Sequence, residues 1–388
     1  MPIVNRLADF ADDIAAWRQE MHRHPEILYD VHWTAALVAE KLKSFGLDEV
    51  TTGIGKTGVV GVIRGRKSGS GRVIGLRADM DALRISEETG KPYASTIPGR
   101  MHACGHDGHT AMLLGAARYL AETRNFDGTA VVIFQPAEEG GGGGKAMIED
   151  GLMERWKIQE VYGMHNMPGI PLGAFGINPG SMLASTDEFT ITISGRGGHA
   201  AKPHETIDPI ATAAAIVQSL QTIVSRNVDP IDSVVVSTTR FHAGDAHNII
   251  APTAEIGGTV RTLRAETRDF AEARIRAIAT SVAAAYGATA DVDYDRNYPV
   301  TRNHADQADF AARVASEIVG ESHVDRGTPP IMAGEDFSYM LEARPGAFIF
   351  IGNGDSAGLH NPHYDFADAA IPFGASYWAR LVETAMPA

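Results

Sequence analysis

The 388-residue sequence predicts an α/β protein with a mostly parallel sheet, interrupted by an inserted ferredoxin-like α+β domain. Helical stretches alternate with short apolar runs from residue 1 to about 180, and a similar run, "AFIFI", returns at 347–351. Between these regions the pattern changes to half-exposed strands and amphipathic helices. We therefore expect the first domain over 1–183 and 296–388, and the inserted domain over 184–295.

Three apolar runs predict strands of the first domain: "VIGL" at 73–76, "AVVIF" at 130–134 and "VYGM" at 161–164. A helix is expected over "TAMLLGAARYLAE", which follows the histidine-rich stretch 101–109. The stretch "RGRKSGSGR" at 64–72 is rich in glycine and serine, which predicts a solvent-exposed hairpin turn. Strands and helices in alternation are typical of a parallel sheet covered by helices.

The inserted domain opens with "DEFTITISG", in which Phe189, Ile191 and Ile193 alternate with polar neighbours as in a half-buried strand. A helix with Pro209 in its first turn follows, then two strands, a second helix and a last strand. This is the element order of a split βαβ unit. The expected ranges are 187–195, 206–226, 233–241, 253–263, 266–287 and 289–295.

The composition excludes several classes of function. The formal net charge is −14 and no basic cluster is longer than "RGRK", so a nucleic-acid partner is not expected. The sequence has no run of eighteen apolar residues, so no membrane span is expected, and its start does not resemble a secretory signal, which predicts a cytoplasmic protein. Its single cysteine cannot form an internal disulfide, and a reducing compartment suits a thiol that stays a thiolate.

Polar side chains follow the expected strands at the points where they end. Because the carboxyl ends of parallel strands open on one crevice, side chains far apart in the sequence are expected to share a site there. The histidine-rich stretch 101–109, which precedes the expected helix "TAMLLGAARYLAE", is expected to lie at the edge of the same crevice. The side chains concerned are Asp79, Asp81, Cys104, His106, His109, Glu138, Glu139, His165 and His360.

This mixture of histidines, one thiolate and several carboxylates suits a borderline divalent cation such as Zn²⁺ or Mn²⁺. More than four candidates indicate two ions, and paired metals are a recurrent device for hydrolysis. The adjacent residues Glu138 and Glu139 are then expected to have two different roles. One carboxylate holds metal, and the other moves a proton from the attacking water to the leaving amine.

Some of these residues also have a purely structural interpretation. Cys104 taken alone is typical of a small buried hydrophobe, but its flanking histidines favour a metal ligand. His22 and His24 are interpreted as structural. The glycines at 140–144 are not a phosphate-binding loop, because Ala146 stands where such a loop needs Ser or Thr. We expect them to let the backbone turn tightly into the next helix.

Two residues of the inserted domain stay open on spacing alone. His199 lies in "GRGGHAAKPH", where it either donates a hydrogen bond to a developing oxyanion or belongs to a turn. Asn248 in "DAHNIIAP" is either a polar contact between strands or a turn residue. The residues alone do not separate these alternatives.

Taken together, the motifs resemble the M20 family of metallopeptidases, from about residue 15 to the C-terminus. The resemblance is to the amidohydrolase branch, which contains hippurate hydrolases, N-acyl-L-amino-acid amidohydrolases and plant auxin-conjugate hydrolases. The motifs that carry it are "RHPE", "RADMDAL", "MHACGHDGHTAMLLGAA", "FQPAEEGGGGGKAMIEDG", "GMHNMPG", "GRGGHAAKPH", "HNIIAPTAEIGGTVRTL", "MAGEDFSYML" and "GLHNPHYDF".

The resemblance implies a two-metal catalytic domain interrupted by a lid domain that also mediates dimerisation. It implies Glu138 as the general base and Asp81 as a residue that orients a ligand. His199 would reach the substrate carbonyl, in its own or the partner subunit's site, with Asn248 nearby as a substrate contact. The implied metal ligands are Cys104, His106, Glu139, His165 and His360.

We therefore predict an enzyme that hydrolyses the amide bond of N-acyl amino acids with two divalent ions, Mn²⁺ or Zn²⁺, or else Co²⁺ or Ni²⁺. It is expected to form a homodimer or a higher homo-oligomer. A dipeptidase, or a hydrolase of larger acyl conjugates, would use the same site, and a non-catalytic metal-binding dimer is the alternative outside enzymes. Arg296 and Arg302 are candidates for binding the substrate carboxylate.

Overall fold

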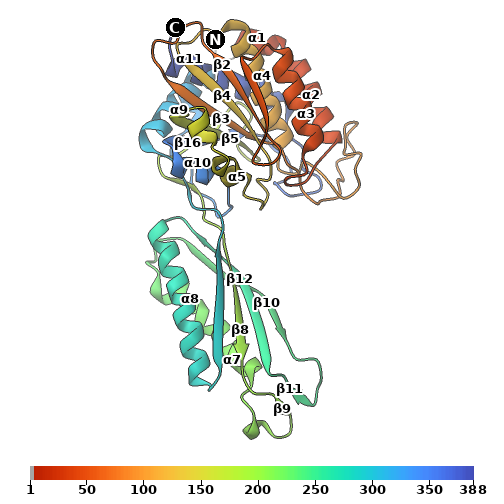
Figure 1. Ribbon diagram of the computed structural model, residues 1–388, viewed down its shortest axis with the longest axis vertical. Helices are drawn as coiled ribbons and strands as arrows, with labels where there is room; N and C mark the ends of the chain where they lie inside the picture. The colour runs from red at the N-terminus through yellow and green to blue at the C-terminus, as the bar shows by residue number, and fades with distance from the viewer. Residues whose placement is uncertain (1–3) are drawn as a thin grey trace. The chain divides into compact units, whose positions relative to one another are not determined.

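The computed structural model describes residues 4–388, and the chain divides into two compact units (Figure 1). The first contains the chain up to Met182, together with Arg302–Pro329 and Asp336–Ala388. The second contains Leu183–Thr301 and Pro330–Glu335, so it is inserted into the chain of the first. The chain passes between them four times: in β7 (Ser181–Leu183), in β14 (Thr301–Arg302), after Pro329 and after Glu335.

The first unit is built on an eight-stranded mixed sheet with the strand order β1-β2-β4-β3-β5-β16-β6-β15. Its centre, β4-β3-β5-β16, is parallel throughout, as the apolar runs predicted, and antiparallel pairing occurs toward both edges. The strands are β1 (Glu49–Ile54), β2 (Gly58–Arg64), β3 (Val73–Asp79), β4 (Thr129–Gln135), β5 (Glu160–Met167), β6 (Phe175–Gly176), β15 (Val324–Asp325) and β16 (Gly346–Gly352).

Helices cover both faces of this sheet. On β5, the Tyr162 ring lies 6.1 Å from that of Phe310 in α9, whereas the next residue, Gly163, faces Phe337 of α10. Since successive strand residues point to opposite faces, α9 and α10 lie on opposite sides. With α9 (Ala305–Val319) are α1 (Asn5–Asp9), α2 (Ala11–Arg23), α3 (His32–Ser44), α4 (His106–Thr123) and α11 (Ile371–Ala385); with α10 (Phe337–Ala343) are α5 (Gly143–Glu149) and α6 (Leu152–Arg155).

The connection 64–72 differs from its prediction. Most of it is exposed, as expected, but it is not a hairpin turn. β4 lies between β2 and β3 and pairs with both, antiparallel with β2 and parallel with β3. The connection therefore passes over the end of a third strand. Glycine and serine indicate a turn, but they do not indicate which strand the chain joins next.

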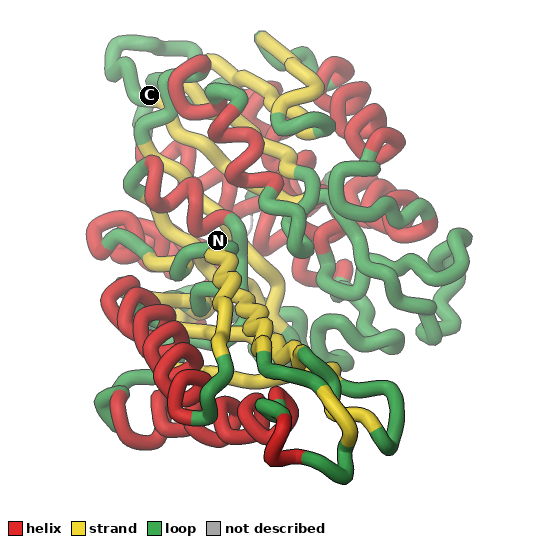
Figure 2. Tube along the Cα trace, turned by 60° about the horizontal axis from the view of Figure 1, so that its bottom comes forward, coloured by secondary structure: helices red, strands yellow, loops and turns green. Residues whose placement is uncertain are grey.

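The second unit has an antiparallel sheet of order β10-β12-β8-β13, with two helices along one face (Figures 1 and 2). Phe189, Ile191 and Ile193 point into the core that this face forms with the helices. A small ribbon, β9 (Gly198–His199) paired with β11 (Ile249–Ile250), follows the end of β8. The other elements are β8 (Asp187–Ser194), α7 (Pro209–Thr222), β10 (Val234–Ala243), β12 (Thr253–Thr262), α8 (Ala265–Ala285) and β13 (Thr289–Arg296). None of the helices within residues 4–388 is long and apolar enough to cross a membrane.

Candidate metal centre

The carboxyl ends of the parallel strands bring the candidate residues together. Asp79 is the last residue of β3, and Asp81 lies two positions beyond it. The Asp81 carboxylate accepts the backbone N–H groups of Glu138 and Glu139, at 3.0 and 3.1 Å. Asp81 thus holds the loop after β4 against the end of β3, which is a positioning role.

The loop after β4 turns sharply, as the glycine tract predicted. Ala137, just before the two glutamates, has a φ of 55°, an uncommon value for a residue with a side chain. Gly142, with a φ of 66°, precedes the first residue of α5. A Cβ on Gly143 would lie 1.7 Å from the Pro136 carbonyl oxygen, so only glycine fits there.

Two histidines present one ring nitrogen each to the centre. His106 Nδ1 donates to the backbone carbonyl of Asp81 at 2.8 Å, and His165 Nδ1 donates to that of Asn166 at 2.6 Å. When these rings are neutral, their Nε2 atoms are acceptors that can bind a cation. His165 Nε2 lies 3.3 Å from Cys104 Sγ, and His106 Nε2 lies 3.9 Å from a carboxylate oxygen of Glu139.

His109 is a candidate metal ligand by its position in the sequence, but in the structure both of its ring nitrogens are hydrogen-bonded. Its Nδ1 donates to Asp79 at 2.6 Å, and its Nε2 accepts the backbone N–H of Asn166 at 2.9 Å. Asp79 is also bound by Arg77 at 2.7 Å. Burial opposes the charge on Asp79, but His106, Arg77 and His109 outweigh it and hold the pKa of this carboxyl well below its usual range. Arg77, Asp79 and His109 thus form a hydrogen-bonded layer beside the ligand groups.

His360 comes from the loop after β16 and completes the centre. Its Nε2 lies 3.3 Å from Glu139 Oε1, its side chain is 52% exposed, and its backbone is in the left-handed region with a φ of 61°. Ligand atoms within 4.8 Å of one another form several groups, and two of these groups share Cys104. They are Cys104, His106 and His165, and Cys104, Glu139 and His360. A second carboxylate, that of Glu138, lies 4.0 Å from His106 Nε2.

The chemistry of these groups fits divalent metal. His106 Nε2 is buried and accepts no hydrogen bond from any described residue. Burial lowers the pKa of His106, but Asp79 and Asp81 outweigh it and raise it to about 10, so a positive charge is favoured at this position. Burial, with Glu139 and Glu138 nearby, raises the pKa of the Cys104 thiol well above its usual range. A thiolate here therefore needs a cation beside it.

Comparison with known proteins agrees with this centre. The model of peptidase family M20/M25/M40 matches residues 75–384. The chain belongs to this family. It is 45% identical to a hippurate hydrolase of Campylobacter jejuni, over 98% of both chains, and 38% identical to an N-acetylcysteine deacetylase of Bacillus subtilis, over 94% of both. It also resembles the crystal structure of a dinuclear metal-binding peptidase of family M20 from Bacillus subtilis, with a TM-score of 0.86, 34% identity and coverage of 98% and 99%. These relatives place it in the amidohydrolase branch, and the chain is a metal-dependent amidohydrolase.

In this M20 amidohydrolase, the second unit carries His199 and Asn248 on the β9–β11 ribbon. His199 pairs with Ile249, and the Asn248 carbonyl accepts the backbone N–H of Ala200 at 3.0 Å. The exposed His199 ring accepts the N–H of Ala201 at Nδ1, at 3.1 Å. The neutral ring therefore carries its proton on Nε2, where it is available to donate.

The two arginine candidates differ. Arg296 is engaged in its own unit, where it binds Glu272 and Asp269, each at 2.7 Å. A ligand carboxylate would have to compete with these two for its guanidinium. Arg302 is exposed.

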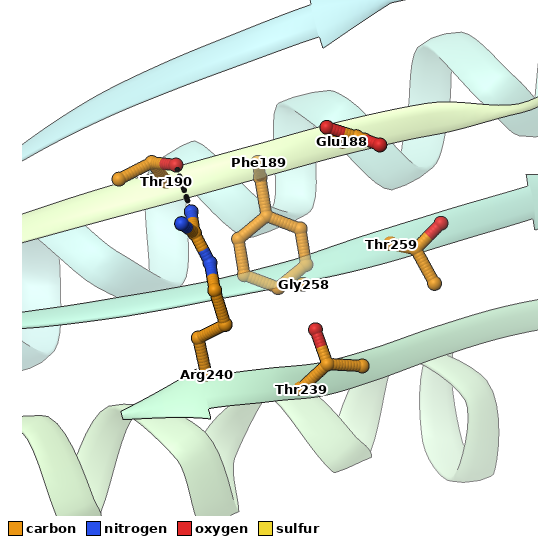
Figure 3. A pocket seen from close by; sticks show the side chains of 7 residues that line it. All are labelled: Glu188, Phe189, Thr190, Thr239, Arg240, Gly258 and Thr259. Atoms are coloured by element: carbon orange, nitrogen blue, oxygen red, sulfur yellow. Dashed lines mark hydrogen bonds between the residues drawn. The ribbon is translucent and has the colours of Figure 1, made fainter. Parts of the chain in front are cut away.

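A separate hollow lies on the helix-free face of the second unit's sheet (Figure 3). There Arg240 of β10 reaches across the sheet and donates to Thr190 of β8 at 3.0 Å. The hollow measures about 340 Å³ and has no histidine or cysteine in its lining, so it does not share the chemistry of the metal centre. It is lined by Glu188, Phe189, Thr190, Thr239, Arg240, Gly258 and Thr259.

Proposed function

We propose that this M20 amidohydrolase cleaves N-acyl amino acids to a carboxylic acid and a free amino acid. The observation that carries the proposal is the pair of ligand groups that share Cys104, with the Glu138 carboxylate beside them. The names of the Campylobacter and Bacillus relatives describe enzymes for substrates of this chemical class.

The residues that would hold two divalent ions are Cys104, His106, Glu139, His165 and His360. Mn²⁺ and Zn²⁺ suit this mixed set best, and Co²⁺ and Ni²⁺ are further options. Such ions acidify a water molecule and polarise the scissile carbonyl. Asp81 fixes the ligand set by binding the backbone N–H of Glu139 and, through its carbonyl, the ring of His106.

Glu138 acts as the general base in this proposal. Its carboxylate accepts a proton from the attacking water, a bond forms between the water oxygen and the acyl carbon, and the amide C–N bond breaks. Glu138 then returns the proton to the departing nitrogen. The His199 Nε2–H donates to the carbonyl oxygen as negative charge develops on it, and Asn248 contacts the substrate from the same ribbon.

The second unit serves as a lid and dimerisation domain in this proposal, within a cytoplasmic homodimer or a higher homo-oligomer. We keep residues 184 and 295, the borders expected from the sequence, as the limits of this lid domain in the proposal. A role for the unit beyond packing is supported by the ribbon, which presents an exposed histidine with a donor nitrogen.

The test is a substrate panel on the full chain loaded with Zn²⁺, Mn²⁺ or Co²⁺ in turn. N-acetyl and N-benzoyl amino acids and dipeptides are incubated with and without a chelator, and the released amino acid is measured. We expect release from the N-acyl amino acids that the chelator abolishes. Cleavage of dipeptides alone would make the chain a dipeptidase, and no release with any metal would favour a non-catalytic metal-binding protein.

A further inference from the structure

We infer that Arg18 of α2 is a positioning residue that ties together the two chain segments carrying His106 and His360. The inference rests on the metal centre proposed above, and concerns a residue outside both ligand groups. Arg18 lies behind the centre, and its side chain is 0% exposed. A fully buried guanidinium is retained in a fold only where anionic and carbonyl partners surround it.

The partners of Arg18 come from two segments. Its Nη1 lies 3.6 Å from Asp107, the residue that follows His106 at the start of α4. The same atom lies 3.6 Å from Asp365, and Nε donates to Asp368 at 2.7 Å. Its Nη2 donates to the Phe366 carbonyl at 3.4 Å. Three carboxylates and a carbonyl from the His106 and His360 segments thus converge on one cation.

These two segments also touch each other directly. The His360 N–H donates to the Ala103 carbonyl at 2.8 Å, next to Cys104. A Cβ on Gly108 would lie 2.3 Å from the ring of Phe366, so the start of α4 and the loop after His360 pack without a gap. A displacement of either segment at Arg18 would therefore reach the ligands.

His22, one turn further along α2, makes a second connection of the same kind. Its Nδ1 lies 2.8 Å from Asp107 and its Nε2 lies 3.3 Å from Glu87. The residue after Glu87, Glu88, donates its N–H to the carbonyl of Pro362 at 2.9 Å, in the His360 segment. Arg18 therefore contacts both segments directly, whereas His22 contacts Asp107 and reaches the His360 segment only through Glu87 and the neighbouring Glu88. These contacts make α2 a support of the ligand spacing.

The experiment measures Co²⁺ binding directly, by competition with a coloured chelator and by the visible and thiolate-to-cobalt absorption of the bound ion. The variants are Arg18→Met, which keeps the length of the side chain without its charge, and Arg18→Lys, which keeps the charge without the fork of donors. Arg268→Met is the matched control, because Arg268 is a buried arginine paired with Asp187 at 3.0 Å in the other unit.

We expect Arg18→Met to weaken Co²⁺ binding by about tenfold or more, the loss typical for residues that support metal ligands, and to change the absorption spectrum. Arg18→Lys should recover part of both. Arg268→Met should lower stability and leave affinity and spectrum unchanged. Wild-type affinity and spectrum in Arg18→Met would overturn the inference.

Two further outcomes are distinguishable. If the unmodified protein binds no Co²⁺, the proposed metal centre itself is wrong. If Arg18→Met does not fold, Asp368→Asn replaces it, because this change removes one partly exposed partner on the His360 side only. Weaker Co²⁺ binding by Asp368→Asn supports the role of Arg18, and unchanged binding contradicts it.

Discussion

Glu138 and Glu139 share one support but have different surroundings. The two oxygens of Asp81 hold both backbone N–H groups, so the glutamates start from the same rigid turn. Both carboxylates form a ligand group with His106, but only that of Glu139 also joins Cys104 and His360. Neighbouring positions thus reach different chemistry, and this difference can be tested by removing one charge.

Glu138→Gln is expected to keep its metal and to lose turnover. Glutamine has the size of the carboxylate but cannot accept the proton, and positioned acid–base groups contribute about 10²- to 10⁴-fold to a rate. The measurement is kcat with an N-acyl amino acid, alongside the metal content of the same sample. Cys104→Ala is the opposite control, because it should lower the metal content. Substantial turnover in Glu138→Gln would show that another group is the base.

The residue types of the centre could be predicted from the residues alone, but only the family resemblance separates His106, as a ligand, from His109. His106 and His109 both lie in the first turn of α4, and their sequence neighbours do not distinguish them. The difference depends on Asp79 and Asn166, which come from two other strands and occupy both nitrogens of His109. Such contacts can be identified only when the order of the strands in the sheet is known.

At the scale of elements, α2 meets α4 through a charged histidine. Burial lowers the pKa of His22, but Asp107 and Glu87 outweigh it and raise it to about 9. Arg18 opposes this charge, and the rings of Tyr93 and His102 lie beside it. The folded protein therefore keeps His22 protonated at a pH where an unfolded chain would have released the proton.

This predicts a pH-dependent contribution to stability. The folded-state pKa of His22 is raised, so the contribution is fully present below pH 6.5 and is lost as the pH rises through about 9. It amounts to between about 3 and 4 kcal/mol at most, at about 1.4 kcal/mol for each tenfold change in proton affinity. Urea unfolding of metal-loaded wild type and His22→Gln between pH 6 and 10 measures it. The advantage of wild type should shrink as the pH rises, and a constant difference would contradict the protonated state.

The positions of the strands in the sequence are easier to predict than the strands with which each one pairs. The apolar runs locate β3, β4, β5 and β16 because a strand buried on both faces is apolar along its whole length. β4 pairs with β3 along one edge and with β2 along the other, so the place of β2 depends on strands that are distant in the sequence. A local pattern does not contain that information, which is why the connection 64–72 was wrongly expected to be a hairpin.

In the whole molecule, the position of His199 within the second unit bears on whether it reaches the metal centre of its own subunit or that of the partner. β8 begins with Asp187, close to the link at Leu183, and ends at Ser194, after which the ribbon follows. Its 8 residues span about 26 Å at about 3.3 Å per residue. His199 is therefore held at the end of its unit that lies away from the chain connections. We predict that it serves the metal centre of the partner subunit in the proposed homodimer.

Mixing two inactive variants tests this prediction. Glu138→Gln and His199→Ala are each expected to lose most activity alone. In a mixed dimer, the subunit with His199→Ala keeps its own Glu138 and receives His199 from its partner, so one of its two sites is complete. After equal amounts are unfolded and refolded together, half the dimers are mixed, and about a quarter of the wild-type activity should return.

The control is the same mixture without refolding, in which subunits do not exchange and activity should stay low. A refolded mixture that remains inactive, while refolded wild type recovers, would place His199 in the site of its own chain. A quarter of the activity would show that neither subunit is complete without the other. Dissociation would then abolish turnover even when every metal ligand is in place, because the donor to the developing oxyanion would be missing.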